Sequence, residues 1–561
     1  MLKQSHTESY RVIQRHAEKY RVKQRHAEKH KEVQRRAEIY KVKHRTSVNP
    51  LHLCSTLLCI DKRYQKLERS DKLKMGEITI GEFRISTDHY INGKRVSSAN
   101  TFTDISPIDG SVLGEVSAGG AKEVDMAVKA AQEAFPAWAA LGPEGRLPYL
   151  DRLAHIIEEN VPALAKVETT DNGSLYEASL LRVMKRGGHN IHWFAEYAVD
   201  KLKGEAWDTV HRNAHNKVRY DPSGVAAIIT PWNAPFMLGT WKVGPALAAG
   251  CTVVMKPTEW APLTSSLLAD FADEAGLPPG VFNVVQGVGE VAGDALVKHP
   301  GVARISFTGS PETARIIGAN AASNLTPCSF ELGGKSPLIV FEDADKELAL
   351  ENMIEQYDNC GQVCLAGTRI LVQASIADEM MQRMKERAAT LKVDTPMDFE
   401  TDVGPLIHPE HFQKVDGMVQ RAIADGATLV YGGQPHARGG LFYEPTLFTD
   451  VDEASELWQK EVFGPVLIFD TFETEEEAIQ KANHSDYGLA AIIFTQNETR
   501  ANRVAAQVSA GLVWINCFYV RDLAQPFGGT KNSGIGREGG IWSFDFFSDI
   551  KNVTHRYGTF K

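Results

Sequence analysis

From residue 75 onward, short apolar runs alternate with segments whose apolar residues recur at helical spacing. The runs are rich in β-branched and aromatic residues, as buried strands are, and they are VAAII (225–229), CTVVM (251–255), VFNVV (281–285) and RISF (304–307). Helices are expected between them at 237–249, 264–275, 289–299 and 311–323. Strands that alternate with helices form right-handed βαβ units, so this pattern predicts an α/β fold with a parallel sheet covered on both faces.

A second series of the same kind fills the C-terminal half of the chain. Its expected strands are LIVF (338–341), RILVQ (369–373), VLIF (466–469), LAAIIF (489–494) and LVWI (512–515), with helices at 377–391 and 410–425. Segments 208–220 and 545–556 belong to neither series, and their alternating apolar and polar residues predict exposed strands that need a partner. The expected division is one lobe from 75–207 and 221–332, a second lobe from 333–530, and bridging segments at 208–220 and 531–561.

The first 74 residues differ from the rest in both pattern and charge. Residues 10–45 imperfectly repeat a ten-residue unit that begins as YRVIQRHAEK and lacks Gly and Pro, which predicts a helix or a poorly ordered segment. Ten residues advance a helix by about 1000°, about 80° short of three turns, so the apolar stripe precesses and forms no continuous face. The leader carries 20 Lys and Arg against 8 Asp and Glu, whereas the rest of the chain carries 41 against 63. It is either a solvated tail, an arm for nucleic acid, anionic membrane or import machinery, or a segment that precedes a true start at Met75.

The composition excludes several protein classes. A chain of 561 residues with 43% hydrophobic and 24% charged residues is neither disordered throughout nor collagen-like. Seven cysteines without a Cys-x-x-Cys pair favour a reducing compartment, and we predict a cytoplasmic protein. The sequence has no run of about 18 apolar residues, so no membrane span is expected, and no metal site is predicted.

The stretch NCGQVCLAGTR (359–369) contains the first candidate for chemistry. Gly361 and Gly367 bracket Cys364 within an otherwise helix-compatible segment. A thiol near a helix N-terminus has a lowered pKa, which makes Cys364 a candidate nucleophile. The alternative is a small buried hydrophobic residue, which is the role expected of Cys360.

Two further stretches contain a candidate base and a candidate hydrogen-bond donor. In FELGGKSP (330–337), Glu331 stands between apolar residues and before two glycines, so it is either a base of raised pKa or a surface glutamate before a turn. In ITPWNAPF (229–236), two prolines fix φ around Asn233. That amide can donate to a developing oxyanion at the end of a strand, or it can cap the helix that follows.

These stretches, together with VMKPTEW (254–260), FTGS (307–310), EVFGP (461–465) and PFGGTKNSGIGREGG (526–540), resemble the aldehyde dehydrogenase superfamily. The resemblance runs from about Tyr90 to Asn552, and the motifs follow the family's order at compatible spacing. It implies a Rossmann-type NAD-binding lobe in the first series, an α/β catalytic lobe in the second, and a β oligomerisation arm. The arm would make the protein a dimer or a tetramer, with the segment 208–220 pairing with the C-terminal strand across subunits.

The resemblance also implies a reaction, the NAD-dependent oxidation of an aldehyde to a carboxylic acid. Cys364 would attack the aldehyde to give a thiohemiacetal, and the amide of Asn233 and the backbone N–H of Cys364 would stabilise the oxyanion. After hydride transfer to the nicotinamide, Glu331 would activate water to hydrolyse the thioester.

For the cofactor, the resemblance assigns the adenosine ribose to Lys256 and Glu259 and the nicotinamide ribose to Glu461. A carboxylate at Glu259 accepts hydrogen bonds from ribose hydroxyls and repels a 2′-phosphate, so NAD is expected rather than NADP. Gly287, Gly289 and Gly293 follow GxGxxxG spacing, the superfamily's variant of the GxGxxG fingerprint. The full cofactor-binding set implied is Ile229, Thr230, Trp232, Lys256, Glu259, Gly289, Gly293, Thr308, Ser310, Leu332, Glu461 and Phe463.

The segment VWINCFYVRDL (513–523) discriminates best among substrates, because by resemblance it lies in the substrate-lining loop. Arg521 can bind a substrate carboxylate bidentately, or it can pair with Asp522 or another acid at the rim of the loop. With GREGGIWSFDFFSDIKNV (536–553), this segment is most similar to the muconate-type semialdehyde dehydrogenases. Arg182 is a candidate second carboxylate contact, and Phe527 a candidate substrate contact.

Two alternatives stay open at this point. The first is a broad-specificity or betaine-type aldehyde dehydrogenase, for which Phe518 and Tyr519 could form an aromatic cage. The second is a catalytically silent binding or structural protein whose basic leader binds nucleic acid, although no nucleic-acid binding is expected for the body of the chain.

Overall fold

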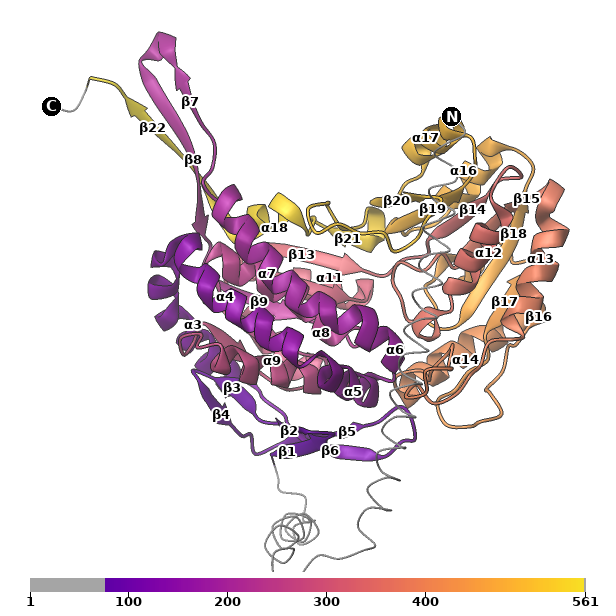
Figure 1. Cartoon of the computed structure of the whole chain (residues 1–561), viewed down its shortest axis with the longest axis horizontal. Helices are drawn as coiled ribbons and strands as arrows, with labels where there is room; N and C mark the ends of the chain where they lie inside the picture. The colour runs from indigo at the N-terminus through magenta and orange to yellow at the C-terminus, as the bar shows by residue number, and fades with distance from the viewer. Residues whose placement is uncertain (1–75, 559–561) are drawn as a thin grey trace, which may run out of the picture. The chain divides into compact units, whose positions relative to one another are not determined.

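The structure is a computed structural model that describes residues 76–558, so the predictions for the basic leader lie outside the described residues. The larger sheet contains β3 (His89–Ile91), β4 (Lys94–Val96), β9 (Val225–Ile229), β10 (Thr252–Lys256), β11 (Phe282–Val284), β12 (Arg304–Gly309), β13 (Cys328–Leu332) and β21 (Gly534–Ile535). Their order is β21–β13–β12–β9–β10–β11–β3–β4 (Figure 1). The strands from β13 to β11 run parallel, and antiparallel strands flank them on both sides. The four predicted strands of the first series are all present.

Helices cover this sheet on both faces, as the strand–helix alternation predicts. Around it lie α3 (Ala121–Ala140), α4 (Gly142–Glu159), α7 (Met184–Lys201), α8 (Pro235–Ala249), α9 (Leu263–Glu274), α10 (Asp294–Lys298) and α11 (Pro311–Ala321). Alternate residues of β9 enter different cores: Ala226 and Ile228 pack with α8 and α9, whereas Ala227 and Ile229 pack with α3 and α11. The expected helix at 289–299 is instead a π-helical turn, η3 (Gly289–Gly293), followed by α10.

The second sheet contains β14 (Pro337–Val340), β15 (Arg369–Gln373), β16 (Thr428–Tyr431), β17 (Thr446–Thr449), β18 (Val466–Phe472), β19 (Ala490–Phe494) and β20 (Leu512–Ile515). Their order is β16–β17–β18–β15–β14–β19–β20, and only β16 is antiparallel to its neighbour. Its helices are α12 (Lys346–Glu355), α13 (Ala374–Ala388), α14 (Pro409–Ala424), α15 (Glu456–Gln459), α16 (Glu475–Asn483) and α17 (Glu498–Gln507). The chain crosses from the first sheet to the second within residues 333–336, so the FELGGKSP motif spans the crossing.

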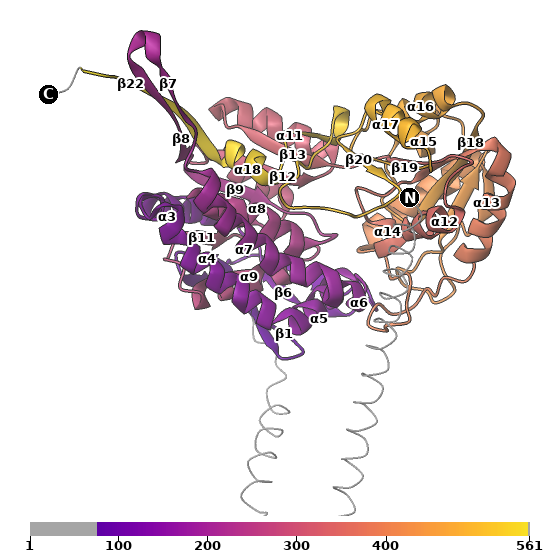
Figure 2. The same cartoon turned by 45° about the horizontal axis from the view of Figure 1, so that its top comes forward.

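A three-stranded ribbon lies outside both sheets and consists of β7 (Ala206–Thr209), β8 (Ala214–Pro222) and β22 (Ser548–Arg556). Both Figure 1 and Figure 2 show it extending away from α7. The segment expected as one strand is a hairpin that turns at Asn213, where φ is 50°. The expected pairing across subunits is also wrong for this ribbon, because β22 pairs with β8 of the same chain. Residues 545–547 belong to α18 (Gly540–Phe547) rather than to the strand.

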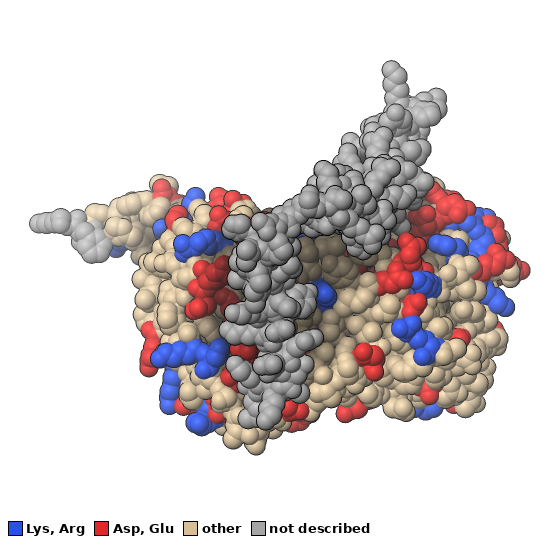
Figure 3. Space-filling model, turned by 60° about the horizontal axis from the view of Figure 1, so that its bottom comes forward, with Lys and Arg blue, Asp and Glu red and all other residues tan. Residues whose placement is uncertain are grey.

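Short elements complete the described part of the chain. They are β1 (Glu77–Ile80), β2 (Phe83–Ser86), β5 (Thr101–Ile105), β6 (Val112–Ser117), α5 (Val161–Asn172), α6 (Tyr176–Ala178), η1 (Ser179–Val183), η2 (Val210–Arg212), η4 (Ala322–Asn324), η5 (Asp358–Gly361) and η6 (Lys531–Ser533). Within residues 76–558, no helix combines the length and the apolar character that a membrane span requires. On the face drawn in Figure 3, acidic and basic side chains of described residues are interspersed.

Candidate active site

A cavity of about 710 Å³ opens at the C-terminal ends of β9, β10, β12 and β13, which is where open parallel sheets bind their ligands. The three residues predicted to be catalytic and all twelve predicted to bind cofactor line this cavity. Arg521, Arg182 and Phe527, the predicted substrate contacts, lie outside its lining. The motifs that carry the predicted catalytic and cofactor-binding residues therefore converge on one cavity.

Cys364 lies in an irregular turn between η5 and β15, so the expected position near a helix N-terminus is wrong. Asn359, Cys360 and Gly361 have φ values of 51°, 56° and 68°, and this left-handed run ends the helical path before the cysteine. Burial raises the pKa of the Cys364 thiol to about 12, Glu461 and Glu331 raise it further, and Arg521 opposes them. The thiol is therefore protonated at neutral pH and needs a base before it can attack. Cys360 is fully buried in the core, as expected.

Glu331 projects from β13 and is 4% exposed, so it is not a surface glutamate. Neither carboxylate oxygen has a hydrogen-bond partner among the described residues. Burial, reinforced by the nearby Glu538, raises its pKa well above the ordinary value, and Lys242 and Arg521 offset only part of this effect. A carboxyl group of raised pKa and free oxygens is well suited to take a proton from a thiol or from water.

A buried ion pair that the sequence analysis missed lies beside this base. Lys242 Nζ is 2.5 Å from Glu538 Oε1, Ser306 Oγ donates to the same oxygen at 3.0 Å, and Trp241 Nε1 donates to Glu538 Oε2 at 2.7 Å. The lysine side chain has no exposed area. The signal available in the sequence was one lysine inside the apolar helix 237–249, because a buried charge requires a partner.

Asn233 occupies the loop between β9 and α8. The helix begins at Pro235 after an N-cap at Ala234 that makes no side-chain cap bond, so Asn233 does not cap it. Its Nδ2 donates to the backbone oxygen of Gln362 at 2.9 Å. An amide nitrogen carries two N–H groups, so this bond leaves one for an oxyanion formed at Cys364.

The cofactor side of the cavity is built from paired polar groups. Lys256 Nζ is 2.9 Å from Glu259 Oε2, and the backbone N–H of Gly289 donates to Glu259 Oε1 at 3.4 Å. Burial raises the pKa of Glu259, but Lys256 and backbone N–H groups together more than offset this effect, so the pKa lies below its ordinary value. Glu461 Oε1 accepts from the backbone N–H of Gly334 at 2.9 Å, and burial raises the pKa of Glu461 to about 7.

Two glycines keep the wall of this region open. A Cβ at Gly293 would meet nothing within 4 Å, and one at Gly289 would meet only a Glu259 oxygen at 4.0 Å. Both residues line the cavity, so side chains there would enter the space itself. Ser310, the N-cap of α11, and Thr308 line it as well. Open glycine walls, a helix N-terminus and a lysine–carboxylate pair fit a dinucleotide.

Three aromatic rings connect this region to Asn233. Trp232 lies 5.1 Å from both Phe463 and His411, measured between ring centroids. His411 Nε2 donates to the backbone oxygen of Phe463 at 2.7 Å, where Phe463 has a left-handed φ of 59°. His411 lies in the predicted helix 410–425, and no local motif marks it.

Arg521 stacks on two aromatic rings next to the reactive groups. Its Cζ is 3.9 Å from the centroid of Phe527 and 4.6 Å from that of Trp241. Within the described part of the chain it forms no ion pair, so the expected alternative of pairing with Asp522 is not seen, and its Nη2 is buried without a hydrogen-bond partner. Burial lowers the pKa of Arg521 to about 9, and the charge of Arg186 lowers it further.

Arg182 and Arg186 occupy different environments on the same stretch of helix. Arg182 Nη2 is 3.2 Å from Asp358 Oδ2, and its guanidinium lies 6.0 Å from the ring of Tyr519. The Cζ of Arg186, a residue without a motif around it, lies 5.9 Å from the centroid of the Trp241 ring, on which Arg521 also stacks. The second arginine near Arg521 is thus Arg186, whereas the guanidinium of Arg182 is already engaged by a carboxylate.

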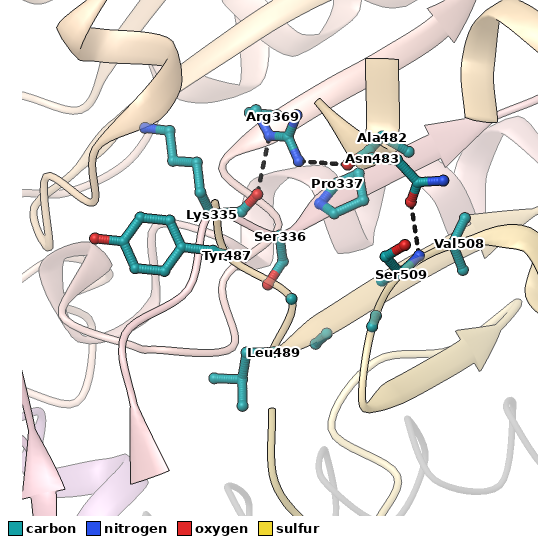
Figure 4. Close-up of a pocket in the computed structure, with 14 residues that line it drawn as sticks. Lys335, Ser336, Pro337, Arg369, Ala482, Asn483, Tyr487, Leu489, Val508 and Ser509 are labelled. Carbon is teal, nitrogen blue, oxygen red and sulfur yellow. Dashed lines mark hydrogen bonds between the residues drawn. The ribbon is translucent and has the colours of Figure 1, made fainter. Parts of the chain in front are cut away.

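A small second cavity lies behind the turn that follows Glu331 (Figure 4). Arg369 spans it: Nε donates to the backbone oxygen of Lys335 at 2.9 Å, and Nη2 to that of Ala482 at 2.8 Å. Nearby, Asn483 Oδ1 accepts from the backbone N–H of Ser509 at 2.6 Å. The bonds of Arg369 tie the turn at Lys335 to the end of α16.

Known proteins are similar to this chain over most of its length. The model of the aldehyde dehydrogenase family matches residues 95–553. The chain is 41% identical over 478 residues to a 2-aminomuconic semialdehyde dehydrogenase of Danio rerio, covering 84% of this chain and 98% of the relative. It is 43% identical over 464 residues to a 5-carboxymethyl-2-hydroxymuconate semialdehyde dehydrogenase of Escherichia coli, covering 81% and 98%.

Among solved structures, betaine aldehyde dehydrogenase from Staphylococcus aureus in complex with NAD+ superposes with a TM-score of 0.82 at 40% identity, covering 85% of this chain and 96% of that one. The family match, the identities and the superposition agree with the predicted fold class. This chain belongs to the aldehyde dehydrogenase family and is an enzyme with its α/β fold.

Proposed function

We propose that this enzyme oxidises a carboxylated, muconate-type semialdehyde to the corresponding acid with NAD. The observation that carries the substrate class is Arg521, whose buried Nη2 lacks a partner and whose charge acts on Cys364 and Glu331. An unpaired buried guanidinium is costly, and a substrate carboxylate would satisfy it bidentately. The muconate-type relatives at 41% and 43% identity support the same class.

The reaction begins with a proton transfer. Glu331 takes the proton from the Cys364 thiol, and the thiolate attacks the aldehyde carbon while the carbonyl electrons move to oxygen. That oxyanion accepts hydrogen bonds from the second N–H of Asn233 and from the backbone N–H of Cys364. NAD, held by Lys256, Glu259 and Glu461, would supply the hydride acceptor that lets the carbonyl re-form as a thioester. Glu331 releases the thiol proton to solvent and then takes a proton from water, the water attacks the thioester, and Cys364 leaves as a thiolate that regains a proton from Glu331.

Lys256 and Glu259 would hold the adenosine ribose, and Glu461 the nicotinamide ribose. The Glu259 carboxylate already accepts two hydrogen bonds, and its charge repels a 2′-phosphate, which favours NAD over NADP. In this proposal 75–207 and 221–332 form the NAD-binding domain, and 333–530 the catalytic domain.

A substrate panel tests the proposal with Arg521→Leu. For a muconate-type semialdehyde we expect KM to rise about 10- to 100-fold, because a charge-assisted hydrogen bond is lost, whereas KM for a neutral aliphatic aldehyde changes less than about threefold. Arg521→Lys keeps the positive charge but loses the bidentate geometry of the guanidinium, so its KM for the carboxylated substrate should be intermediate. Equal effects on both aldehydes would overturn the assignment.

The same panel separates the two other arginines. Arg186→Leu should raise KM for the carboxylated substrate selectively, because Arg186 shares Trp241 with Arg521. The earlier candidate, Arg182, would instead have to exchange Asp358 for the substrate. A larger selective effect for Arg182→Leu than for Arg186→Leu would restore it.

Betaine aldehyde belongs in the panel because Phe518 and Tyr519 stack at 3.9 Å and offer aromatic faces. The positive charge of Arg182, 6.0 Å from the ring of Tyr519, disfavours a quaternary ammonium there, so we expect low activity. A homo-oligomer built through the ribbon and a cytoplasmic location complete the proposal. They are supported by the exposed outer strands of the ribbon and by the free thiols of the five described cysteines.

A further inference from the structure

A frame of hydrogen bonds joins the Cys364 turn to the loop of Asn233. Its centre is Gln362, which is 1% exposed. Gln362 Nε2 donates to the backbone oxygens of Asn359 at 3.0 Å and Pro405 at 3.4 Å, and its Oε1 accepts from the backbone N–H of Ile407 at 3.0 Å. The side chain thus ties the turn to the distant segment 405–407 with every polar atom used.

The backbone of Gln362 provides the second part of the frame, because its oxygen accepts from Asn233 Nδ2 at 2.9 Å. The two ends of an asparagine amide have nearly the same shape, and only the NH₂ end can donate to an oxyanion. A carbonyl oxygen accepts and cannot donate, so contact with Gln362 selects the NH₂ end of Asn233 and excludes its Oδ1.

Asn359 closes the frame from the other side. Its Nδ2 donates to the backbone oxygen of Asn233 at 3.2 Å. Asn359 and Cys360 have left-handed φ angles that non-glycine residues rarely adopt, so surrounding contacts must hold them. The following Gly361 cannot be replaced in place, because a Cβ there would lie 2.0 Å from the backbone oxygen of Gly464.

We propose that Gln362 and Asn359 are positioning residues that orient the amide of Asn233 toward the oxyanion and hold the strained turn before Cys364. This inference rests on the proposed aldehyde oxidation. Neither side chain touches the reacting atoms: Gln362 acts through the backbone oxygen that receives Asn233, and Asn359 acts through the backbone of Asn233.

A double-mutant cycle tests the first role, read as the pre-steady-state burst of NADH formation. Gln362→Met and Asn233→Ala are each expected to slow the burst about 10- to 100-fold, with KM for NAD changed less than about twofold. In the Asn233→Ala background, Gln362→Met should slow it less than about twofold further, because the amide it orients is gone. Independent losses that multiply would overturn the positioning role.

Alkylation of Cys364 by iodoacetamide tests the second role without requiring activity. Release of the strained turn should make Gln362→Met react at least about threefold faster than wild type. Gln373→Met is the matched control, because Gln373 also accepts a backbone N–H, that of Glu342, away from the site. Asn359→Gly keeps the left-handed backbone but loses the bond to Asn233, so it should slow the burst without accelerating alkylation.

The outcomes separate the two proposals. A wild-type enzyme that oxidises no aldehyde rejects the proposed function, and alkylation then still decides whether the turn is held by Gln362. An active enzyme with unchanged alkylation in Gln362→Met and multiplicative burst losses rejects the frame alone.

Discussion

The two halves of the active-site cavity treat their polar groups in opposite ways. On the cofactor side, Lys256 is paired with Glu259, and Glu461 accepts a backbone N–H. On the substrate side, both oxygens of Glu331 are buried without partners within residues 76–558, and so is the Nη2 of Arg521, which lies outside the cavity lining. Burial without a partner costs most for ionisable groups, so the substrate side stores a cost that the paired carboxylates of the cofactor side avoid.

The difference follows the chemistry that each half has to perform. The ribose hydroxyls of a dinucleotide stay uncharged throughout the cycle. The carboxylates that would receive them, Glu259 and Glu461, can therefore be held in place before the cofactor binds. Glu331 has to gain and lose a proton in each cycle, and a partner bonded to it permanently would hold one protonation state. Arg521 reserves its charge for the substrate. Within the active site, unpartnered ionisable groups therefore lie on the side where bonds change.

The largest expected effect comes from a change on the substrate side of the cavity, the removal of the base Glu331. Glu331→Gln keeps the shape of the side chain but removes the base, so kcat should fall about 10²- to 10⁴-fold while KM for NAD changes little. Steady-state NADH formation measures both. Cys364→Ala is the reference, because it should abolish NAD-linked oxidation and still bind NAD. Retention of more than about a tenth of kcat by Glu331→Gln would assign the proton transfer to another group.

A smaller effect is expected on the cofactor side. Glu259→Ala removes the acceptor and releases Lys256, so KM for NAD should rise about 10-fold and KM for NADP should fall. The ratio of the two KM values, measured with one aldehyde, is the readout. Glu290→Ala is the matched control, because Glu290 also lines the cavity and has the same charge. An equal change of the ratio in both variants would point to overall charge rather than to ribose recognition.

The apolar runs were sufficient to predict the parallel strands, because burial on both faces forces nearly continuous hydrophobic sequence. They could not predict the conformation around Cys364. Residues 359–361 are compatible with a helix locally, and the left-handed run arises where Gly361 packs against the backbone of Gly464, about a hundred residues away. A tertiary contact therefore overrides the local helical preference of these residues. Because no helix begins near Cys364, the low thiol pKa that was predicted from a helix N-terminus is wrong as well.

The site residues likewise fall into two groups: those that a local motif marks, and those that only the fold brings together. Residues within compact motifs, such as Glu331 and Lys256, were found because their neighbours mark them. Glu538 and Lys242 are 296 positions apart, so only the fold pairs them. Arg186 and His411 stand in ordinary helical sequence, and only the fold places Arg186 near Trp241 and His411 in the cavity lining. The ribbon shows that the sequence pattern does not identify strand partners. The alternation of apolar and polar residues predicted exposed strands, but it could not show that β22 pairs with β8 of its own chain.

The smallest expected effect tests whether the substrate side does store a cost. The pKa of Glu331 is raised by folding, so between its unfolded value of about 4.3 and its higher folded value the native state holds a proton that the unfolded state has lost. Stability is therefore lost as pH rises through this window.

Gln does not titrate, so the apparent Tm of Glu331→Gln should exceed that of wild type by about 1 °C or more at pH 8, with a smaller difference at pH 5. Differential scanning calorimetry at one scan rate measures this difference. A variant with Gln at the exposed position Glu312 is melted in parallel as the control. Identical melting of Glu331→Gln and wild type at both pH values would mean that Glu331 is solvated or paired in solution, and the contrast between the two halves of the cavity would then disappear.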